Sequence, residues 1–405
     1  MNGGIGILPG VIWTPRTEAE LSAAIANGEL NESHTLDFKR ELGSSDGAKK
    51  DFAKDVAAFS VDGGTILIGV DEGPPVTVSP VNLAGLPERV EQIAAMRVDE
   101  GVMVETTAIE IPSGSGKGVL VVNIPASPRA PHMAGGRYYG RGDKTNYQMS
   151  HAEVLRRHAQ LVQMRHDVLE ELHRREMSMT EGVIAAADGG ALLLLAKPLG
   201  APRHLLKPLT SRNGWQSVLV EIVRQALIPG HHNFVPTFGA PAQDRRPNGV
   251  ALITGMQPGD VFSGASRQAE LVAYENGDLL LQSGRAVMAT GKDRVVLEEL
   301  IVGHAELLVR FAAGICARYG FAGSWQFGLL VTGLAGGNSA LLRTNWANSG
   351  YTYADNTYEA ATTATLMEIT KSPAAVVEDL VGGLLRSLGS HEALPWLQLR
   401  DDQQP

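Results

Sequence analysis

The sequence predicts an α+β protein of two domains, an N-terminal α/β domain with a mixed sheet over residues 1–165 and a C-terminal α+β domain over residues 166–405. Three observations support this prediction. A chain of 405 residues exceeds what one hydrophobic core usually serves. A strand, helix, strand order stands near the N-terminus. From about Thr180 onward the composition shifts toward Ala, Leu, Gly and Val.

The N-terminal elements follow from capping and periodicity. Thr17 to Glu20 forms a capping box that opens a helix ending near Asn27. The next expected elements are a strand at 35–40, a helix at 48–60 with apolar residues at helical spacing, and a strand at 65–70 after Gly63-Gly64. Further elements are a helix at 86–96, a hairpin of 102–111 with 119–124, a strand at 137–139 and a long polar helix at 151–175.

The C-terminal part alternates strands and helices without a repeat. We expect strands at 191–196, 250–254, 269–274, 278–282 and 325–332, with Asn276-Gly277 as a hairpin turn. We expect helices at 216–226, 294–319 and 374–388. In the absence of catalytic motifs, we expect this domain to serve oligomerisation, which gives a homo-oligomer, or sensing.

The most informative segment is the first strand, Leu36 to Lys39, where apolar and charged residues alternate. Because alternate side chains of a strand point to opposite faces, Asp37 and Lys39 share one face. Glu32 precedes this strand and Asp71 ends the next one, so three carboxylates could converge with one lysine. Carboxylate oxygens suit Mg²⁺ or Mn²⁺, and such an ion can activate water against a phosphodiester. The alternative is surface charge, with Asp37 and Lys39 as an exposed pair.

In this hypothesis Glu32, Asp37 and Asp71 hold the metal, and Lys39 orients water or stabilises developing negative charge. A basic segment supplies a place for phosphate. Between Ala126 and Arg165 the chain has seven Lys or Arg residues against two acids, although the whole chain carries a formal charge of −9. The expected phosphate contacts are Arg129, Arg137, Arg141 and Lys144. A solvated surface without a partner is the alternative for the long helix.

Several other classes are excluded. A single cysteine, Cys316, rules out a disulfide framework and a multi-cysteine zinc site, and fits a reducing compartment. The first twelve residues lack a basic residue, and no apolar run approaches the ~20 residues of a membrane span, so we expect a cytoplasmic protein without a membrane partner. The turn Gly114 to Gly118 resembles a phosphate loop but lacks its Ser or Thr and joins two strands.

Three segments together resemble the Schlafen/AlbA-type domain. They are Glu32 to Lys39, then Ala57 to Phe59 with Gly63 to Asp71, and Tyr138-Tyr139 with Arg141 to Thr145. The resemblance covers roughly residues 18–158 in the right order. It implies an α/β nucleic-acid-binding domain, described in bacteria as DNA-binding or divergent ATPase-like, and some relatives are linked to phage defence.

In nuclease members of that family, three acids bind a divalent cation and cleave RNA, especially tRNA. By position these are Glu32, Asp37 and Asp71, with Asp37 where the family more often has Glu. Residues 60–62 and 140–145 depart further from the family pattern. The resulting hypothesis is a metal-dependent endoribonuclease, with RNA favoured over DNA. The alternatives are a non-catalytic DNA- or RNA-binding regulator and an ATP-binding switch protein.

Overall fold

The structure is a computed structural model that describes residues 13–127, 129–179, 190–228, 235–236, 238, 242–254, 269–290, 293–344, 347–348 and 351–394. The chain divides into two compact units, Met1–Val162 with Ala322–Ser324, and Gln163–Phe321 with Trp325–Pro405. The division falls within helix α4 (His151–Met179), as does the predicted boundary after residue 165. The first twelve residues, on which the expectation of no leader sequence rested, lie outside the described residues.

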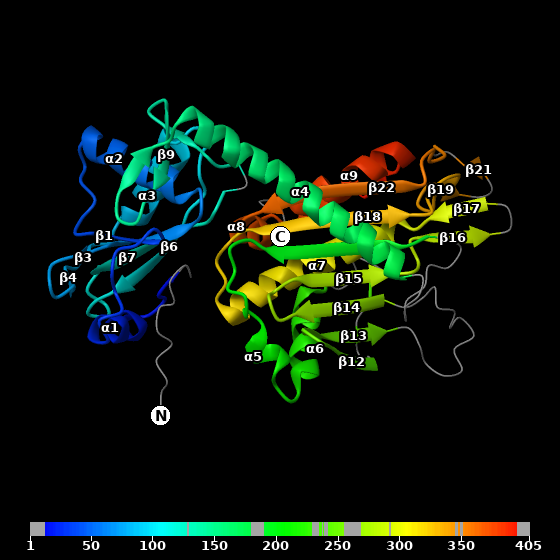
Figure 1. Cartoon of the computed structure of the whole chain (residues 1–405), viewed down its shortest axis with the longest axis horizontal. Helices are drawn as coiled ribbons and strands as arrows, with labels where there is room; N and C mark the ends of the chain where they lie inside the picture. Colours follow the sequence, from blue (N-terminus) through cyan, green and yellow to red (C-terminus); the bar gives the residue numbers. More distant parts are fainter. Residues whose placement is uncertain are drawn as a thin grey trace. The chain divides into compact units, whose positions relative to one another are not determined.

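The first unit is built on a mixed five-stranded sheet (Figure 1). Its order is β1 (Leu36–Lys39), β2 (Gly64–Ile68), β7 (Lys117–Ile124) and β5 (Val81–Asn82), and β6 (Glu105–Glu110) also pairs with β7. β1 and β2 are parallel and joined through α2 (Asp46–Phe59), whereas β2 and β7 are antiparallel. The expected strand, helix, strand unit and the mixed sheet are therefore confirmed.

Each face of this sheet buries an apolar cluster. On one face, α2 and α3 (Leu86–Arg97) pack their apolar side chains against Ile66 and Ile68 of β2. On the other face, α1 (Glu18–Ala26) buries Leu21 against Leu36 and Phe38 of β1. Smaller pieces complete the unit: β3 (Val70–Asp71) pairs with β4 (Thr77–Val78), and β8 (Met133–Ala134), β9 (Arg137–Arg141) and β10 (Asn146–Gln148) form a three-stranded sheet.

The second unit contains a seven-stranded antiparallel sheet (Figure 1). In spatial order its strands are β12 (Ala242–Arg246), β13 (Gly249–Thr254), β14 (Ala269–Tyr274), β15 (Leu279–Ser283), β11 (Leu192–Pro198), β18 (Trp325–Thr332) and β22 (Thr357–Ala364). The second half of α4 covers one face, where Val168 and Leu172 pack on Leu193 and Leu195. Helix α7 (Glu298–Tyr319) contacts β11 and packs between α6 (Trp215–Ala226) and α9 (Pro373–Leu388). The protein is α+β.

Two sequence expectations for this unit need correction. The helix predicted from residue 294 begins at Glu298, because Asp293–Val296 forms strand β17, which pairs with β16 (Val287–Thr290) and β19 (Gly337–Ser339). By length and composition, α7 is also apolar enough to cross a membrane, contrary to our expectation that no such segment exists. However, 78% of its most apolar window is buried inside the protein, as in the core helix of a globular domain.

Gly69 turns the chain out of β2 toward the candidate site. Its φ is +104°, and a Cβ atom there would lie 2.7 Å from the carbonyl oxygen of Gly118. We expect Gly69→Ala to lower the free energy of unfolding by about 2–3 kcal/mol because the residue would be strained and would clash with backbone. Gly73→Ala is the control, since the nearest atom to its Cβ would be 3.9 Å away. Calorimetry that finds equal losses for the two variants would contradict this explanation.

Candidate functional site

Strand β1 presents its two charged residues to the α2 side of the sheet. Leu36 and Phe38 pack in the cluster that contains α1, so the predicted alternation is confirmed. Asp37 lies opposite Ile66, and Lys39 lies opposite Ile68, in the parallel register with β2. The face they share is not open to solvent, since the Asp37 side chain is only 10% exposed. The interpretation of an exposed surface pair is therefore wrong.

Lys39 bridges two carboxylates. Its Nζ lies 3.1 Å from Oδ2 of Asp37 and 2.7 Å from Oδ2 of Asp55, which comes from α2. Burial raises the pKa of Asp55, although the Lys39 charge opposes the shift. Burial lowers the pKa of Lys39, but the charges of Asp55 and Asp37 outweigh it and the net direction is upward. The ammonium therefore stays charged, which suits a group that meets an anionic substrate.

Asp55 was missed by the sequence reasoning, but a signal was present. It follows Phe52 by three residues and precedes Phe59 by four, so it shares the apolar face of the helix. A carboxylate on such a face is buried and needs a partner. Lys39 supplies one, and Nδ2 of Asn146, on β10, donates to Oδ1 of Asp55 at 2.6 Å.

Arg141 closes this network from β9 and does not face solvent. Its side chain is 5% exposed, and its NH2 group donates to Oδ1 of Asp37 at 2.9 Å. The Nε group donates to the carbonyl oxygen of Ser33 at 3.2 Å, and the guanidinium lies 4.4 Å from the ring centre of Phe59. With these partners the guanidinium is turned inward, whereas the sequence suggested a contact with phosphate. It holds Asp37 in place.

Glu32 reaches the open edge of β1. Its Oε1 atom accepts a hydrogen bond from the backbone N–H of Phe38 at 3.2 Å. Burial raises the pKa of Glu32, and the nearby carboxylates of Asp37 and Glu72 raise it further, whereas the Phe38 hydrogen bond lowers it. The Glu72 carboxylate is therefore near enough to that of Glu32 to raise its pKa.

Asp71 points elsewhere. One of its carboxylate oxygens accepts from the N–H of Gly73 at 3.3 Å, and the other lies 3.8 Å from Nε of Arg40. The acid that joins Glu32 is the next residue, Glu72, whose carboxylate lies 3.6 Å from Nζ of Lys144. The predicted trio of Glu32, Asp37 and Asp71 is thus not gathered as expected.

The described residues contain one group of three acids or histidines with ligand atoms within 4.8 Å of one another, His166, Asp167 and Glu170 on exposed turns of α4. The ligand atoms of Glu32, Asp37 and Asp71 do not lie that close together. Those of Glu32, Asp37 and Glu72 do not either.

The other expected phosphate contacts are accessible. Arg129 and Arg137 are exposed, and the side chain of Lys144 is 56% exposed beside Glu72. Lys144 therefore connects the basic segment to the Glu32 and Glu72 pair, while Arg141 is withdrawn into the interior. Three of the four predicted basic residues remain available to a polyanion.

The raised pKa of Glu32 predicts a pH-dependent stability. A carboxyl whose pKa is higher in the folded protein contributes stability that is fully present below its ordinary pKa, 4.5, and is lost as the pH rises through the folded value. Glu32→Gln keeps an oxygen for the Phe38 N–H, so it should raise the melting temperature by roughly 1–3 °C at pH 7, and by less toward pH 4. Calorimetry in EDTA measures this, with Glu29→Gln as control. A constant difference at all pH values would contradict it.

A family comparison decides what this domain is. Residues 32–150, which include β1, β2, β9 and the network around Asp37, match the family model described as Schlafen, AlbA_2. These residues form a Schlafen/AlbA-type domain. Its presence fits nucleic-acid-binding or nuclease-type function. The match leaves the second unit outside it.

Two further comparisons add little to the Schlafen/AlbA assignment. No curated protein matches the chain. Among solved structures, the chain is similar to the DIP2311 protein from Corynebacterium diphtheriae, with 16% sequence identity and a TM-score of 0.24. That similarity covers 33% of this chain and about a quarter, 26%, of the other, and it supports no argument.

The donors around β1 of the Schlafen/AlbA-type domain suit a divalent cation in kind. Oδ2 of Asp37 is buried, and the partner shown for it is the Lys39 ammonium at 3.1 Å. Glu32 and Glu72 repel each other, which a cation would relieve. The acids near β1 also pair with cations. Lys39 pairs with Asp37 and Asp55. Arg141 pairs with Asp37, and Lys144 pairs with Glu72, which lies near Glu32. Carboxylate oxygens are the ligands that Mg²⁺ and Mn²⁺ prefer.

Proposed function

We propose that the Schlafen/AlbA-type domain is a metal-dependent endoribonuclease that binds RNA and hydrolyses its phosphodiester bonds with Mg²⁺ or Mn²⁺. The observation that supports this most directly is the Lys39 ammonium, held between the carboxylates of Asp37 and Asp55, while the Asp37 charge also raises the pKa of Glu32. Cation-binding oxygens and a fixed positive charge together are what phosphodiester hydrolysis requires.

In this proposal Glu32, Glu72 and Asp37 hold the ion, and Glu72 takes the place that the sequence assigned to Asp71. When bound, the ion would supply charge neutralisation at the phosphoryl oxygens and an activated water. Lys39 stabilises negative charge that develops on the phosphate. Asp55 and Arg141 position Lys39 and Asp37, and the exposed cations Arg129, Arg137 and Lys144 bind the RNA backbone.

The test is a cleavage assay of the full chain on labelled tRNA and on single-stranded RNA with Mn²⁺, Mg²⁺ or EDTA. We expect cleavage with either metal, none with EDTA, and loss of cleavage in Asp37→Asn while RNA binding in EDTA persists. Binding without cleavage under any divalent metal would refute the nuclease and leave a regulator that binds nucleic acid. A role in phage defence would be tested separately, by phage plating on cells that express the wild type or Asp37→Asn.

A further inference from the structure

Two pockets of the first unit lie on either side of Arg89. The first, about 520 Å³, is lined by the segment after β1 (40–42), by β5 with the two residues before it (79–82), and near the start of α3 by residues 84–86 and Arg89. The second, about 480 Å³, is lined by Lys49 of α2 and, on α3, by Arg89, Gln92, Ile93, Met96 and Arg97. Because Arg89 lines both, the two pockets adjoin.

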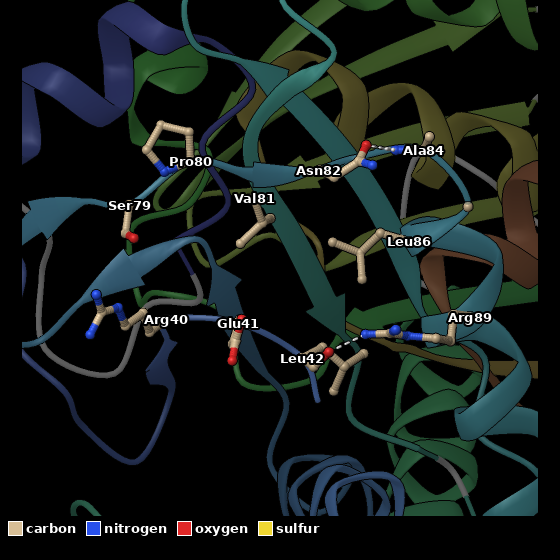
Figure 2. Close-up of a pocket in the computed structure, with 11 residues that line it drawn as sticks. Arg40, Glu41, Leu42, Ser79, Pro80, Val81, Asn82, Ala84, Leu86 and Arg89 are labelled. Carbon is tan, nitrogen blue, oxygen red and sulfur yellow. Dashed lines mark hydrogen bonds between the residues drawn. The ribbon is translucent and has the colours of Figure 1, made fainter. Parts of the chain in front are cut away.

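Arg89 is fixed between the pockets. Its guanidinium donates to the carbonyl oxygen of Leu42, as Figure 2 shows. Its position at the wall therefore depends on the backbone that continues from β1. The first pocket also begins at the end of β1, because Arg40, which lines it, directly follows Lys39 of the candidate site. A nucleic-acid strand that leaves the site past Arg40 would reach the first pocket, then Arg89, and then the second pocket.

The lining is positively charged. Its cations are Arg40, Arg89, Lys49 and Arg97, and Glu41 is the one carboxylate among the lining residues of the two pockets. Arg97 pairs with Asp46 at 2.7 Å, so part of its charge is balanced. The side chain of Arg40 is 74% exposed and lies 3.8 Å from the carboxylate of Asp71. Such a lining attracts a polyanion.

Apolar side chains also form part of the wall of each pocket. Val81 and Leu86 point into the first pocket in Figure 2, and Ile93 and Met96 line the second. Met96 is 73% exposed, so its side chain is accessible to a base. The volumes are within the range of about 300–1,000 Å³ typical of small-ligand sites. A base can enter such a pocket only from a single strand, because bases in a duplex are stacked inside it.

We propose that these two pockets form the track along which single-stranded nucleic acid leaves the cleavage site, with one nucleotide in each pocket and Arg89 between them. This inference rests on the proposed function. It adds a specificity, since an unpaired segment beside the scissile bond is required. It also places the substrate on α2 and α3, whereas the sequence had pointed only to the basic segment between residues 126 and 165.

The test compares two adjacent lysines of α2 in the full-length protein. Lys49 lines the second pocket, whereas Lys50 does not and pairs with Asp46 at 2.9 Å. Binding of a short labelled oligouridylate is measured in EDTA across a salt series, so no cleavage is needed. We expect Lys49→Gln to weaken binding about three- to tenfold and to reduce the salt slope by about 0.7, and Lys50→Gln to leave both nearly unchanged. An RNA duplex of the same length should bind more weakly than the single strand.

The possible outcomes separate the two proposals. If the wild type binds RNA but Lys49→Gln and Lys50→Gln behave alike, the track is wrong and the nuclease proposal stands. If the wild type binds neither RNA form, both proposals fall. Cross-linking with 4-thiouridine gives a second readout, since cross-links should fall on peptides that contain Met96 or Leu86, and cross-links confined to residues 129–144 would overturn the track.

Discussion

Replacing Glu72 with glutamine should slow metal-dependent RNA cleavage by orders of magnitude, and replacing its neighbour Asp71 with asparagine should leave most of the rate. Glu72 lies near Glu32, whereas Asp71 is turned toward Arg40 and the N–H of Gly73. Loss of one group that organises charge at a reacting phosphate typically costs on the order of 10²–10³-fold in rate. We therefore expect a fall of that size for Glu72→Gln and a change of less than about fivefold for Asp71→Asn.

The two substitutions form a matched pair, since each replaces one carboxylate by its amide at adjacent positions. Initial rates with saturating Mn²⁺ measure the effect on catalysis, and calorimetry confirms that both variants fold. The reverse result, with Asp71→Asn inactive and Glu72→Gln active, would restore the trio that the sequence suggested. Equal losses of cleavage rate in both variants would contradict a role for Glu72 alone. Both acids would then contribute to ion binding, or the substitutions would disturb the local backbone.

Removing the Arg141 guanidinium should produce the largest loss of stability. In Arg141→Met the buried carboxylate of Asp37 keeps only Lys39, and the carbonyl oxygens of Ser33 and Leu36 lose a donor. Breaking a buried ion pair on one side typically costs about 3–5 kcal/mol. We expect a loss in that range for the first unit, measured by calorimetry or urea denaturation.

Arg137→Met provides the control for Arg141→Met, because Arg137 begins the same strand but is exposed. It should change stability by less than about 0.5 kcal/mol and should weaken RNA binding in EDTA. The double variant Arg141→Met with Asp37→Asn should lose less than the sum of the single losses, because the uncompensated charge is gone. A stable Arg141→Met variant that fails to bind RNA would mean that the guanidinium contacts phosphate after all.

The sequence identified β1 and its alternation well, because a strand period of two is a local property. It also identified the Asn276-Gly277 hairpin, where Gly277 has a φ of +99°, whereas α2 ends at Phe59, before the predicted Gly63-Gly64. In the second unit it mistook Asp293–Val296 for the start of a helix, since Val295-Val296 continues into an apolar run without a turn signal. It missed β22, whose threonines and alanines show no apolar alternation.

The site was only partly predictable, for physical reasons that differ by residue. Gly69, which follows β2, has a positive φ. The alternation of side chains along β2 therefore does not predict the direction in which Asp71 points. Arg141 stands in an Arg-Gly-Asp sequence that resembles an exposed loop, and its burial depends on Asp37, 104 residues earlier. Contacts over such separations leave no local pattern. The proximity of Glu32 and Glu72 likewise depends on tertiary structure.

The hydrogen bond from the Phe38 N–H to Glu32 also occupies a backbone donor at the edge of the sheet. β1 is the outermost strand of its sheet, and its outward N–H groups would otherwise template a foreign strand. Glu32 takes the donor of Phe38, and the carbonyl oxygen of Ser33 takes that of Leu36. These contacts leave fewer free donors for an added strand at this edge. Glu32→Ala removes the acceptor of the Phe38 N–H and should promote aggregation through this edge, whereas Glu32→Gln keeps an acceptor there.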